Sequence, residues 1–288
     1  MSVSQQPEDP AVALDTGTDE LLCRVADGVA LVTLNKPHKK NALGDELTPA
    51  LRALLPVLEQ DARVGCILLT GAGDAFCAGG DVSEMGQSNP SAKPSAESPA
   101  PASVEQRVAT LTEKQMQLTH RLYHLKKITI AALPGAAAGA GLSIALACDL
   151  RVGSERAFIT TAFRNIGLSG DYGASWFLSR LVGLGRAKAL FYRADRLDAA
   201  TCEAWGIFNA VFSEATFRAD SLAYAKDIAQ GPRQALTLMK ANLQAGSEQD
   251  LSSSLALEAK HLIACSGTAE SKEAIRAFME KRPPNFGV

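Results

Sequence analysis

Two short, unbroken apolar runs, each ending in glycine or proline, constrain the fold of this chain more than any other feature. The runs are VGCILLTGAG at 64–73 and ITIAALP at 128–134. Both have the length and composition of strands that are buried on both faces, as in a parallel sheet covered by helices. Helical patterns follow these runs. The strand-then-helix order of the first two thirds therefore predicts an α/β fold.

Other segments predict further strands and helices of this fold. The stretch LLCRVADGVALVTLNKP predicts two strands joined at Asp27-Gly28, a strong hairpin signal. The stretch DELTPALRALLPVLEQDA has leucines at helical spacing, and its Pro56 is expected to end or kink the helix. A long amphipathic helix is expected at about 104–126. From Asp171 onward the pattern is mostly helical.

The chain divides into three parts by composition. Residues 1–18 are polar and acidic and are expected to form a flexible arm. Residues 19–212 carry the strand and helix patterns of the core, which includes a segment rich in Ser, Pro and Ala at 86–103 that predicts a mobile loop. Residues 213–288 form the C-terminal helical region, and no internal repeat is evident.

Composition excludes several classes of protein. The 288 residues carry a net charge of −2, which gives no electrostatic reason to expect nucleic acid or an anionic membrane as partner. No run reaches the roughly 20 apolar residues of a membrane span, and the N-terminus does not resemble a signal peptide. The six cysteines are scattered without a CxxC pair. Reduced thiols in a cytoplasmic protein are the expected reading.

The first candidate for chemistry is the glycine-rich turn in GAGDAFCAGGDVSEM, residues 71–85. A strand ends here, and small residues lead to Gly79-Gly80-Asp81. Such residues let backbone N–H groups come close to a ligand. A plain strand-to-helix turn capped by Asp81 fits the same pattern.

The second candidate is PGAAAGAGLSIALACDL, residues 134–150. Small residues followed by an apolar helix bring free N–H groups and the positive end of a helix dipole to one point, which suits an anion or a developing oxyanion. Tight packing of a helix on a sheet is the alternative. A dinucleotide site is weakly supported, because the pattern is not GxGxxG with an acid downstream.

The third candidate is Asp171 in IGLSGDYGASWFLSRLVG, residues 166–183. The aspartate precedes a predicted helix, so its ordinary role would be an N-cap. Taken alone, the segment leaves open whether Asp171 caps the helix or takes part in chemistry.

Taken together and in order, these segments resemble the crotonase superfamily, the enoyl-CoA hydratase/isomerase family. The resemblance extends from about residue 20 to the end of the chain and rests on these segments: LNKPHKKNAL, AFCAGGDVSEM, GAAAGAGLSIALACDLRV, IGLSGDYGASWFLSRLVGLGRAKAL, ATCEAWGIFNAVF and EAIRAFMEKRPPNF. It implies a crotonase-like spiral of ββα units and C-terminal helices that assemble a homotrimer or a hexamer. It also implies a coenzyme A thioester as substrate, with no permanently bound cofactor and no metal.

The resemblance assigns roles to the glycine-rich turns. Backbone N–H groups of Gly80 and Ala140 would polarise the thioester carbonyl, and Ala140 stands where glycine is usual. The neighbours expected along the coenzyme A are Ala78, Gly79, Asp81 and Gly141. The basic residues that would meet its phosphates are Lys36, His38, Lys39 and Lys40, for which a solvated basic surface is the alternative. His38 has no companion ligands for a metal.

Members of the family differ in the side chains around the polarised thioester. Hydratases with two glutamates carry them at positions occupied here by Ser143 and Phe163, neither of which can act as an acid or base. Some enoyl-CoA isomerases carry a single acid at the position of Asp171. The side chains expected to line the pocket and raise the pKa of Asp171 are Met116, Phe158, Phe163, Tyr172 and Trp176, with core packing as their alternative role.

Two related chemistries fit less well. Aryl-CoA dehalogenases share the aspartate but have a histidine at the position of Met116, and His120 and His124 are expected to be ordinary helix residues. Thioester hydrolases of the 3-hydroxyacyl type need a second acid where Phe163 stands.

The sequence therefore favours enoyl-CoA isomerisation or hydration with Asp171 as the only general acid/base. A thioester or C–C bond hydrolase, in which Asp171 directs a water, remains open. A homologue that binds coenzyme A esters or nucleic acid without catalysis also remains open.

Overall fold

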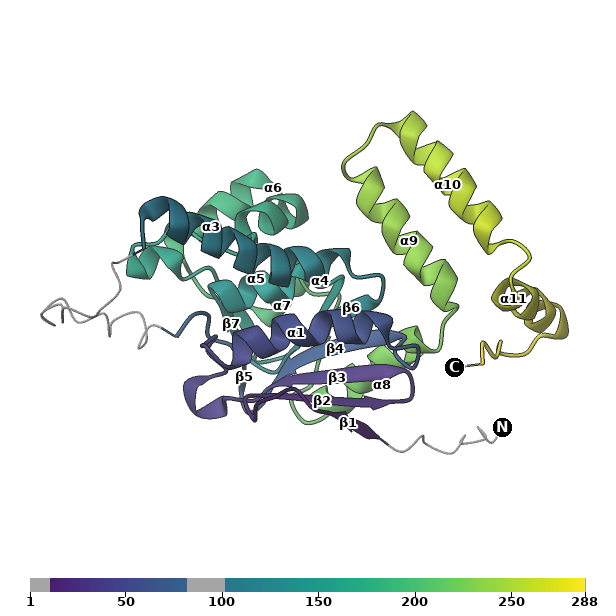
Figure 1. Cartoon of the computed structure of the whole chain (residues 1–288), viewed down its shortest axis with the longest axis horizontal. Coiled ribbons are helices and arrows are strands. Elements are labelled where there is room, and N and C mark those ends of the chain that lie inside the picture. The colour runs from purple at the N-terminus through teal and green to yellow at the C-terminus, as the bar shows by residue number, and fades with distance from the viewer. Residues whose placement is uncertain (1–10, 82–101, 288) are drawn as a thin grey trace, which may run out of the picture.

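The strands form two sheets that share one core (Figure 1). The computed structural model describes residues 11–81 and 102–287. Within that range the large sheet has seven strands in the order β1-β2-β3-β4-β6-β8-β11, and the small sheet has four in the order β10-β9-β7-β5. Their bounds are β1 Val12–Leu14, β2 Leu21–Ala26, β3 Val29–Leu34, β4 Cys66–Gly71, β5 Ala75–Cys77, β6 Ile128–Leu133, β7 Ala136–Ala138, β8 Leu150–Ser154, β9 Phe158–Thr160, β10 Leu197–Asp198 and β11 Ala210–Phe212.

Strand direction follows from the connections. The strands β2 and β3 form an antiparallel hairpin whose turn has positive φ at both Asp27 (49°) and Gly28 (77°), which confirms the predicted hairpin. From β3 to β11 all neighbours in the large sheet are parallel. Every residue of β4 is buried, as expected for a parallel strand covered on both faces.

The chain alternates between the two sheets. The strands β4, β6 and β8 of the large sheet are followed by β5, β7 and β9 of the small sheet, and helices separate these pairs. This alternation is the predicted spiral of ββα units, which the structure confirms. One consequence matters for function: β5 and β7 are parallel neighbours, so the chain leaves both strands at the same edge of the small sheet.

Helices cover both faces of the large sheet. The α-helices are α1 Leu47–Gln60, α3 Val104–Gln115, α4 Arg121–His124, α5 Ala140–Ala147, α6 Ala174–Arg193, α7 Ala199–Ala204, α8 Phe217–Ala229, α9 Arg233–Gly246, α10 Leu251–Cys265 and α11 Ala269–Glu280. Short 3₁₀ turns are η1 Pro37–Lys39 and η3 Phe163–Ile166, and η2 Met116–His120 is a π-helical segment between α3 and α4.

Two hydrophobic clusters hold these layers together. The larger fills the space between the two sheets and the helices α1, α4, α5 and α6. The smaller packs α8 through Phe217, Ala225 and Ala229 against the opposite face of the large sheet. The sheet is therefore buried on both sides, which is why its central strands carry so few polar residues.

Several elements differ from the sequence-based expectations. Pro56 does not end α1, because buried leucines on both sides of it (Leu51, Leu54, Leu55 and Leu58) hold the helix on the core. The short strands β10 and β11 interrupt a region expected to be helical. Within the expected N-terminal arm, β1 pairs with β2. The expected loop at 86–103 lies outside the described residues except for 102 and 103, and Ser103 caps α3.

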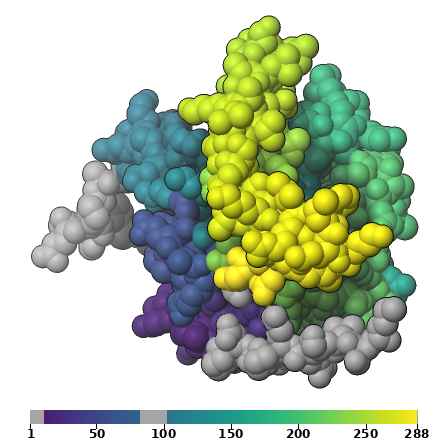
Figure 2. Space-filling model, turned by 90° about the vertical axis from the view of Figure 1, so that its right-hand side faces the viewer, coloured from purple at the N-terminus to yellow at the C-terminus, as the bar shows by residue number. Residues whose placement is uncertain are grey.

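The C-terminal helices α9, α10 and α11 extend away from the two sheets (Figures 1 and 2). A buried ion pair anchors α9 to the core, with Lys240 Nζ 2.8 Å from Asp149 Oδ2. The same carboxylate oxygen accepts hydrogen bonds from the backbone N–H and the hydroxyl of Thr129, both at 2.8 Å. The start of β6, the start of β8 and α9 are thus joined through one aspartate.

Candidate active site

The two glycine-rich turns of the sequence meet at one edge of the small sheet. They follow β5 and β7, whose register pairs Ala75 with Ala136. A Cβ atom on Gly79 would lie only 2.9 Å from the Ala138 carbonyl oxygen and 3.5 Å from the Ala140 nitrogen. Only glycine permits this approach, so the structure brings the first turn against the start of the helix that follows the second.

Both turns present backbone N–H groups at this point. The backbone of Leu43 takes up the groups on either side of Gly80, accepting from the Asp81 N–H at 2.9 Å and donating to the Gly79 carbonyl at 2.8 Å. Ala140 is the first residue of α5. Within the described part of the chain, neither the Gly80 N–H nor the Ala140 N–H donates to another group. Two free donors at the positive end of a helix suit a developing oxyanion.

Helix α5 is held in place by close packing rather than by an amphipathic face, since all eight of its residues are buried. Its N-cap Gly139 has φ 50° and ψ −127°, a conformation that disfavours any side chain. A Cβ on Gly141 would lie 2.5 Å from the Cys77 carbonyl oxygen. The helix start is therefore packed directly on β5, which fixes the two donor groups relative to each other.

Asp171 lies in a loop of unusual backbone conformation that leads into α6. Gly170, Tyr172 and Gly173 all have positive φ, at 108°, 51° and 85°. The N-cap of α6 is Gly173, with no side-chain cap, so Asp171 does not cap the helix through its carboxylate. The structural role considered for this aspartate in the sequence is thereby excluded.

The Asp171 side chain is half-buried, and one of its two carboxyl oxygens is fully buried. Its Oδ1 atom has no hydrogen-bond partner among the described residues. Burial raises the pKa of this carboxyl to about 6. A carboxyl whose pKa is close to neutrality can both take up and release a proton, which is what general acid/base catalysis requires.

A hydrogen bond ties the Asp171 loop to the oxyanion helix. The hydroxyl of Ser143, one turn into α5, donates to the Asp171 carbonyl oxygen at 3.0 Å. Ser143 occupies a position where two-glutamate hydratases carry an acid. Here it instead forms a hydrogen bond with the backbone of Asp171, the residue that carries the remaining carboxylate. On the other side of the loop, the Gln115 side-chain oxygen accepts the Tyr172 N–H at 2.6 Å.

The predicted pocket residues fall into two groups. Phe163 and Tyr172 lie next to the site: the Phe163 ring is 3.6 Å from a Cβ built on Gly139 and 3.5 Å from one built on Gly170. Tyr172 is buried, and burial raises the pKa of its hydroxyl. These two rings supply apolar surroundings for the neighbouring loop.

The other three predicted pocket residues have contacts of their own. Trp176 packs against Tyr123 and Phe177. The Arg196 guanidinium lies 4.6 Å from the Phe158 ring centroid. Met116 is 48% exposed in η2. None of the ring contacts that these residues make involves Asp171, and their role at a ligand stays a prediction.

Two of the four basic residues near the first turn form ion pairs. Lys36 is buried, with its Nζ 2.8 Å from Glu20. Lys39 forms an ion pair of 2.6 Å with the buried Asp81, which joins η1 to the turn. His38 and Lys40 are exposed, and the Lys40 carbonyl accepts the Ala78 N–H. Binding of coenzyme A phosphates by this group stays a prediction.

His120 and His124 pair with each other. Their ring centroids are 4.2 Å apart, and His124 Nδ1 lies 2.9 Å from the His120 carbonyl oxygen. Partial burial and the neighbouring charges lower the pKa of His120. Both residues are exposed, as expected for ordinary residues of a helix.

Sequence reasoning missed two residues beside the loop. Gln115 sits in the polar stretch TEKQMQ, and no local signal distinguishes it from its neighbours. The positive charge of Arg52 in α1 lowers the pKa of the Tyr172 hydroxyl, against the larger effect of burial. A single charge among the leucines of LRALL was the available signal for Arg52.

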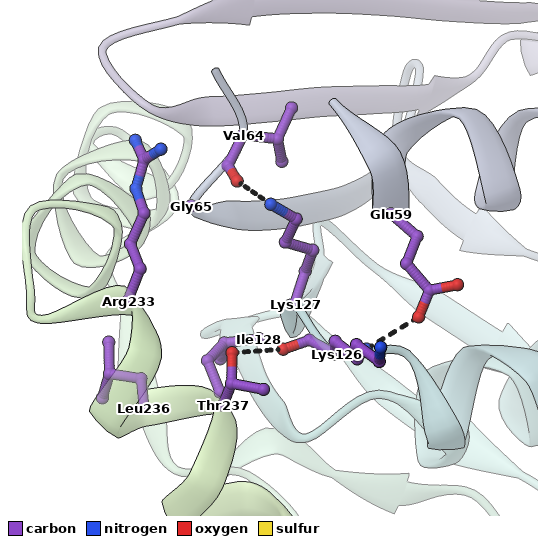
Figure 3. A pocket seen from close by; sticks show the side chains of 9 residues that line it. All are labelled: Glu59, Val64, Gly65, Lys126, Lys127, Ile128, Arg233, Leu236 and Thr237. Carbon is purple, nitrogen blue, oxygen red and sulfur yellow. Dashed lines mark hydrogen bonds between the residues drawn. The ribbon is translucent and has the colours of Figure 1, made fainter. Parts of the chain in front are cut away.

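A cavity of about 210 Å³ lies elsewhere, where β4 and β6 begin (Figure 3). Its cationic side chains hold backbone carbonyls: Lys127 Nζ donates to Val64 at 2.7 Å, and Arg233 donates to Arg63 at 3.3 Å. Since the glycine-rich turns follow the ends of β5 and β7, this cavity is separate from the candidate site.

Two further properties of the described residues bear on the class of protein. None of the described helices combines the length and apolar character needed to cross a membrane. Across residues 11–81 and 102–287, no three His, Cys, Asp or Glu side chains are grouped so as to hold a metal ion.

Comparison with known proteins relates this geometry to a family. The family model for enoyl-CoA hydratase/isomerase matches residues 24–288. The chain is 32% identical to 1,2-epoxyphenylacetyl-CoA isomerase of Escherichia coli, over 92% of this chain and 97% of that protein. It is 34% identical to 4-chlorobenzoyl coenzyme A dehalogenase-1 of an Arthrobacter species, over 88% of each.

Comparison with solved structures leads to the same family. An enoyl-CoA hydratase from Polaromonas sp. JS666 superimposes with a TM-score of 0.82 at 29% identity, over 92% of this chain and 98% of that one. The proteins similar to this chain are named for three different reactions on coenzyme A thioesters, so similarity leaves the reaction to be argued from the site. With the crotonase fold and a family model that matches nearly its whole length, the chain belongs to the enoyl-CoA hydratase/isomerase family.

Proposed function

We propose that this protein moves the double bond of an enoyl-CoA, with Asp171 as its single general acid/base. Hydration of an enoyl-CoA is the closely related alternative within the same family. In both reactions the thioester oxygen would be held by the N–H groups of Gly80 and Ala140. Coenzyme A would enter as part of the substrate, and the reaction needs no metal.

The proposed isomerisation conserves every atom of the substrate. The Asp171 carboxylate removes a proton from the α carbon of a 3-enoyl-CoA. The electron pair of that C–H bond moves into the conjugated dienolate, whose negative oxygen accepts hydrogen bonds from the two backbone donors. The same carboxyl group then returns the proton to the γ carbon, and a 2-enoyl-CoA results. Each donor contributes about 3 kcal/mol on the scale of known oxyanion holes.

The observation that carries the proposal is the state of the half-buried Asp171 carboxyl. Its Oδ1 is buried without a hydrogen-bond partner among the described residues, and burial raises the pKa of the carboxyl to about 6. Ser143 and Phe163 cannot supply the two carboxylates of the two-glutamate hydration mechanism. One carboxyl is sufficient for isomerisation, because the group that takes a proton from the α carbon can return a proton to the γ carbon.

The proposal predicts that Asp171→Asn abolishes proton abstraction while leaving binding intact. With 3-hexenoyl-CoA in D₂O, deuterium enters the acyl group whenever the Asp171 carboxyl exchanges its proton with solvent before returning it. Both kcat and this incorporation should fall by about 10²–10⁴-fold. Binding of hexanoyl-CoA should change little, since the amide is isosteric with the carboxyl. Mass spectrometry of the acyl-CoA and titration calorimetry measure the two quantities.

Three outcomes would overturn the proposal. An Asp171→Asn enzyme with wild-type deuterium incorporation would remove Asp171 from the chemistry. Release of free coenzyme A thiol from the same substrate, without isomerised product, would favour the hydrolase in which Asp171 directs a water. Tight binding of acyl-CoA with no change to any enoyl-CoA would favour a non-catalytic binding protein.

The binding of coenzyme A and the assembly of the protein belong to the same proposal. We place the coenzyme A phosphates near His38, Lys39 and Lys40, next to the first turn, where Lys39 already pairs with Asp81. We also propose a homotrimer or a dimer of trimers built through the C-terminal helices, in the cytoplasm. The exposed apolar residues of α9–α11 support assembly, and the six free cysteines support a reducing compartment.

A further inference from the structure

The peptide unit between Asp171 and Tyr172 is held from both sides by side chains of other elements. Its carbonyl oxygen accepts the Ser143 hydroxyl at 3.0 Å, and its N–H donates to Gln115 Oε1 at 2.6 Å. The C=O and N–H of a trans peptide point in opposite directions. The two side chains therefore hold one peptide plane from opposite edges. Both hydrogen bonds are partly buried.

This peptide unit has a conformation that the loop does not favour by itself. Tyr172 has φ 51°, in the left-handed region where a bulky residue is uncommon and strained. Gly170 and Gly173 on either side have the backbone freedom to let the peptide rotate. Holding the plane therefore depends on contacts from outside the loop.

Gln115 is placed for this contact by the helix that carries it. It is the last residue of α3, and all other residues of α3 are exposed. The π-helical segment η2 begins directly after it. Segments of this kind are rare and occur frequently at functional sites, because they change the direction in which side chains leave a helix. The contact with Tyr172 is thus the one that joins α3 to the site.

We propose that Gln115 and Ser143 are positioning residues that fix the direction of the Asp171 carboxyl by clamping the Asp171–Tyr172 peptide. The proposal rests on the role of Asp171 given above. Rotation of the clamped plane would swing the Asp171 side chain relative to the donors at Gly80 and Ala140. A displacement of about 1 Å in a reacting group can cost about a hundredfold in rate.

The kinetic test compares Gln115→Leu and Ser143→Ala with Gln117→Leu. Gln117 lies two residues further along and is exposed, and among the described residues its side chain hydrogen bonds only to Glu113. With 3-hexenoyl-CoA, each clamp variant should lose about 10–100-fold in kcat, with KM within about threefold of wild type. Gln117→Leu should keep wild-type kcat. Gln115→Glu retains an acceptor oxygen and should recover most of the lost kcat.

A second measurement does not depend on turnover. Amide hydrogen exchange at Tyr172 should be slow in the wild type and about tenfold or more faster in Gln115→Leu, because the N–H loses its acceptor. Gln117→Leu should leave this exchange unchanged. Mass spectrometry of a peptide spanning 168–177 reports it even if the substrate is another enoyl-CoA.

The two proposals fail in different ways. If Asp171→Asn is inactive but both clamp variants keep wild-type kcat and Gln115→Leu keeps slow Tyr172 exchange, the clamp is wrong and the function stands. If the wild type and Asp171→Asn catalyse equally, the role of Asp171 is wrong, and the exchange measurement alone decides whether the peptide is held. Loss of kcat in Gln117→Leu equal to that in Gln115→Leu would overturn the clamp.

Discussion

The burial that makes Asp171 a useful base also makes its charged form unfavourable for folding. The carboxyl has an ordinary pKa of 3.8 when exposed and about 6 in the folded protein, raised by desolvation. Between about pH 4 and pH 6 the folded state keeps a proton that the unfolded state has lost, so stability falls as pH rises through this window. Above pH 6 the full cost is present.

Asp171→Asn should therefore stabilise the protein while it inactivates the enzyme. At about pH 8 we expect the free energy of unfolding to rise by about 1–2 kcal/mol, once solvent screening of this half-buried group is allowed for. At about pH 5 the gain should be smaller, because the wild-type carboxyl is then largely protonated. Urea unfolding of both proteins at the two pH values measures the difference. An equal gain at both would argue against a charge effect.

At the scale of single elements, the relation between β5 and α5 decides whether two free N–H groups stand side by side. Helix α5 is short and buried all round, so no amphipathic stripe sets its rotation. Its position depends on the contact of Gly141 with Cys77, where an added Cβ would lie 2.5 Å from the carbonyl oxygen and 2.7 Å from Sγ. Backbone occupies this space, so it cannot be cleared by a side-chain rotation.

Gly141→Ala should push α5 away from β5. We expect a loss of about 1–3 kcal/mol in the free energy of unfolding, the usual cost of overpacking, together with a fall in kcat as the donors separate. The matched control is Gly246→Ala at the end of α9, where an added Cβ meets nothing within 4 Å. That change should leave kcat unchanged and stabilise α9 by up to about 1 kcal/mol. Calorimetry and kinetics of both variants test this. A Gly141→Ala enzyme with wild-type stability and wild-type kcat would show that the contact between Gly141 and Cys77 is unimportant.

At the scale of the whole molecule, the C-terminal helices form an exposed apolar surface. They extend beyond the two-sheet body (Figure 2), and Phe278 and Leu243 are 82% and 77% exposed. The ion pair of Lys240 with Asp149 holds the middle of α9 on the core, whereas α10 has no buried residue. Exposed apolar surface of this extent is typical of a region that associates with other chains.

Phe278→Glu should weaken the assembly that we propose. A charge placed in an apolar interface costs more than it does in water. We expect the variant to shift from a trimer or hexamer towards the monomer at micromolar concentration, as measured by analytical ultracentrifugation. The control is Lys272→Glu, which also adds negative charge to α11 at an exposed polar position. A monomeric wild type, or equal effects of the two variants, would contradict the assignment of this surface.

The features predicted from sequence are those that local patterns encode. The apolar run of β4, the Asp27-Gly28 turn and the spacing of most helices depend on neighbours along the chain, and the structure confirms them. The two-residue β10 and the half-buried β11 are strands because β9 and β8 offer them partners, which no local pattern reveals. Pro56 stays inside α1 for a similar reason, since packing of the helix on the core outweighs the lost hydrogen bond.

By itself the sequence determined the α/β class and the two glycine-rich turns, because glycine and apolar periodicity act on their neighbours along the chain. The spiral of ββα units and the choice of Asp171 as the remaining acid came from the resemblance of the motifs to those of the family. Only the tertiary structure decided that the turns meet, that Asp171 is buried and caps nothing, and that Gln115 reaches the Tyr172 N–H. These are contacts between residues far apart in the chain. Their geometry is set by how β5, β7, α3 and the loop before α6 pack together, and a linear pattern does not contain it.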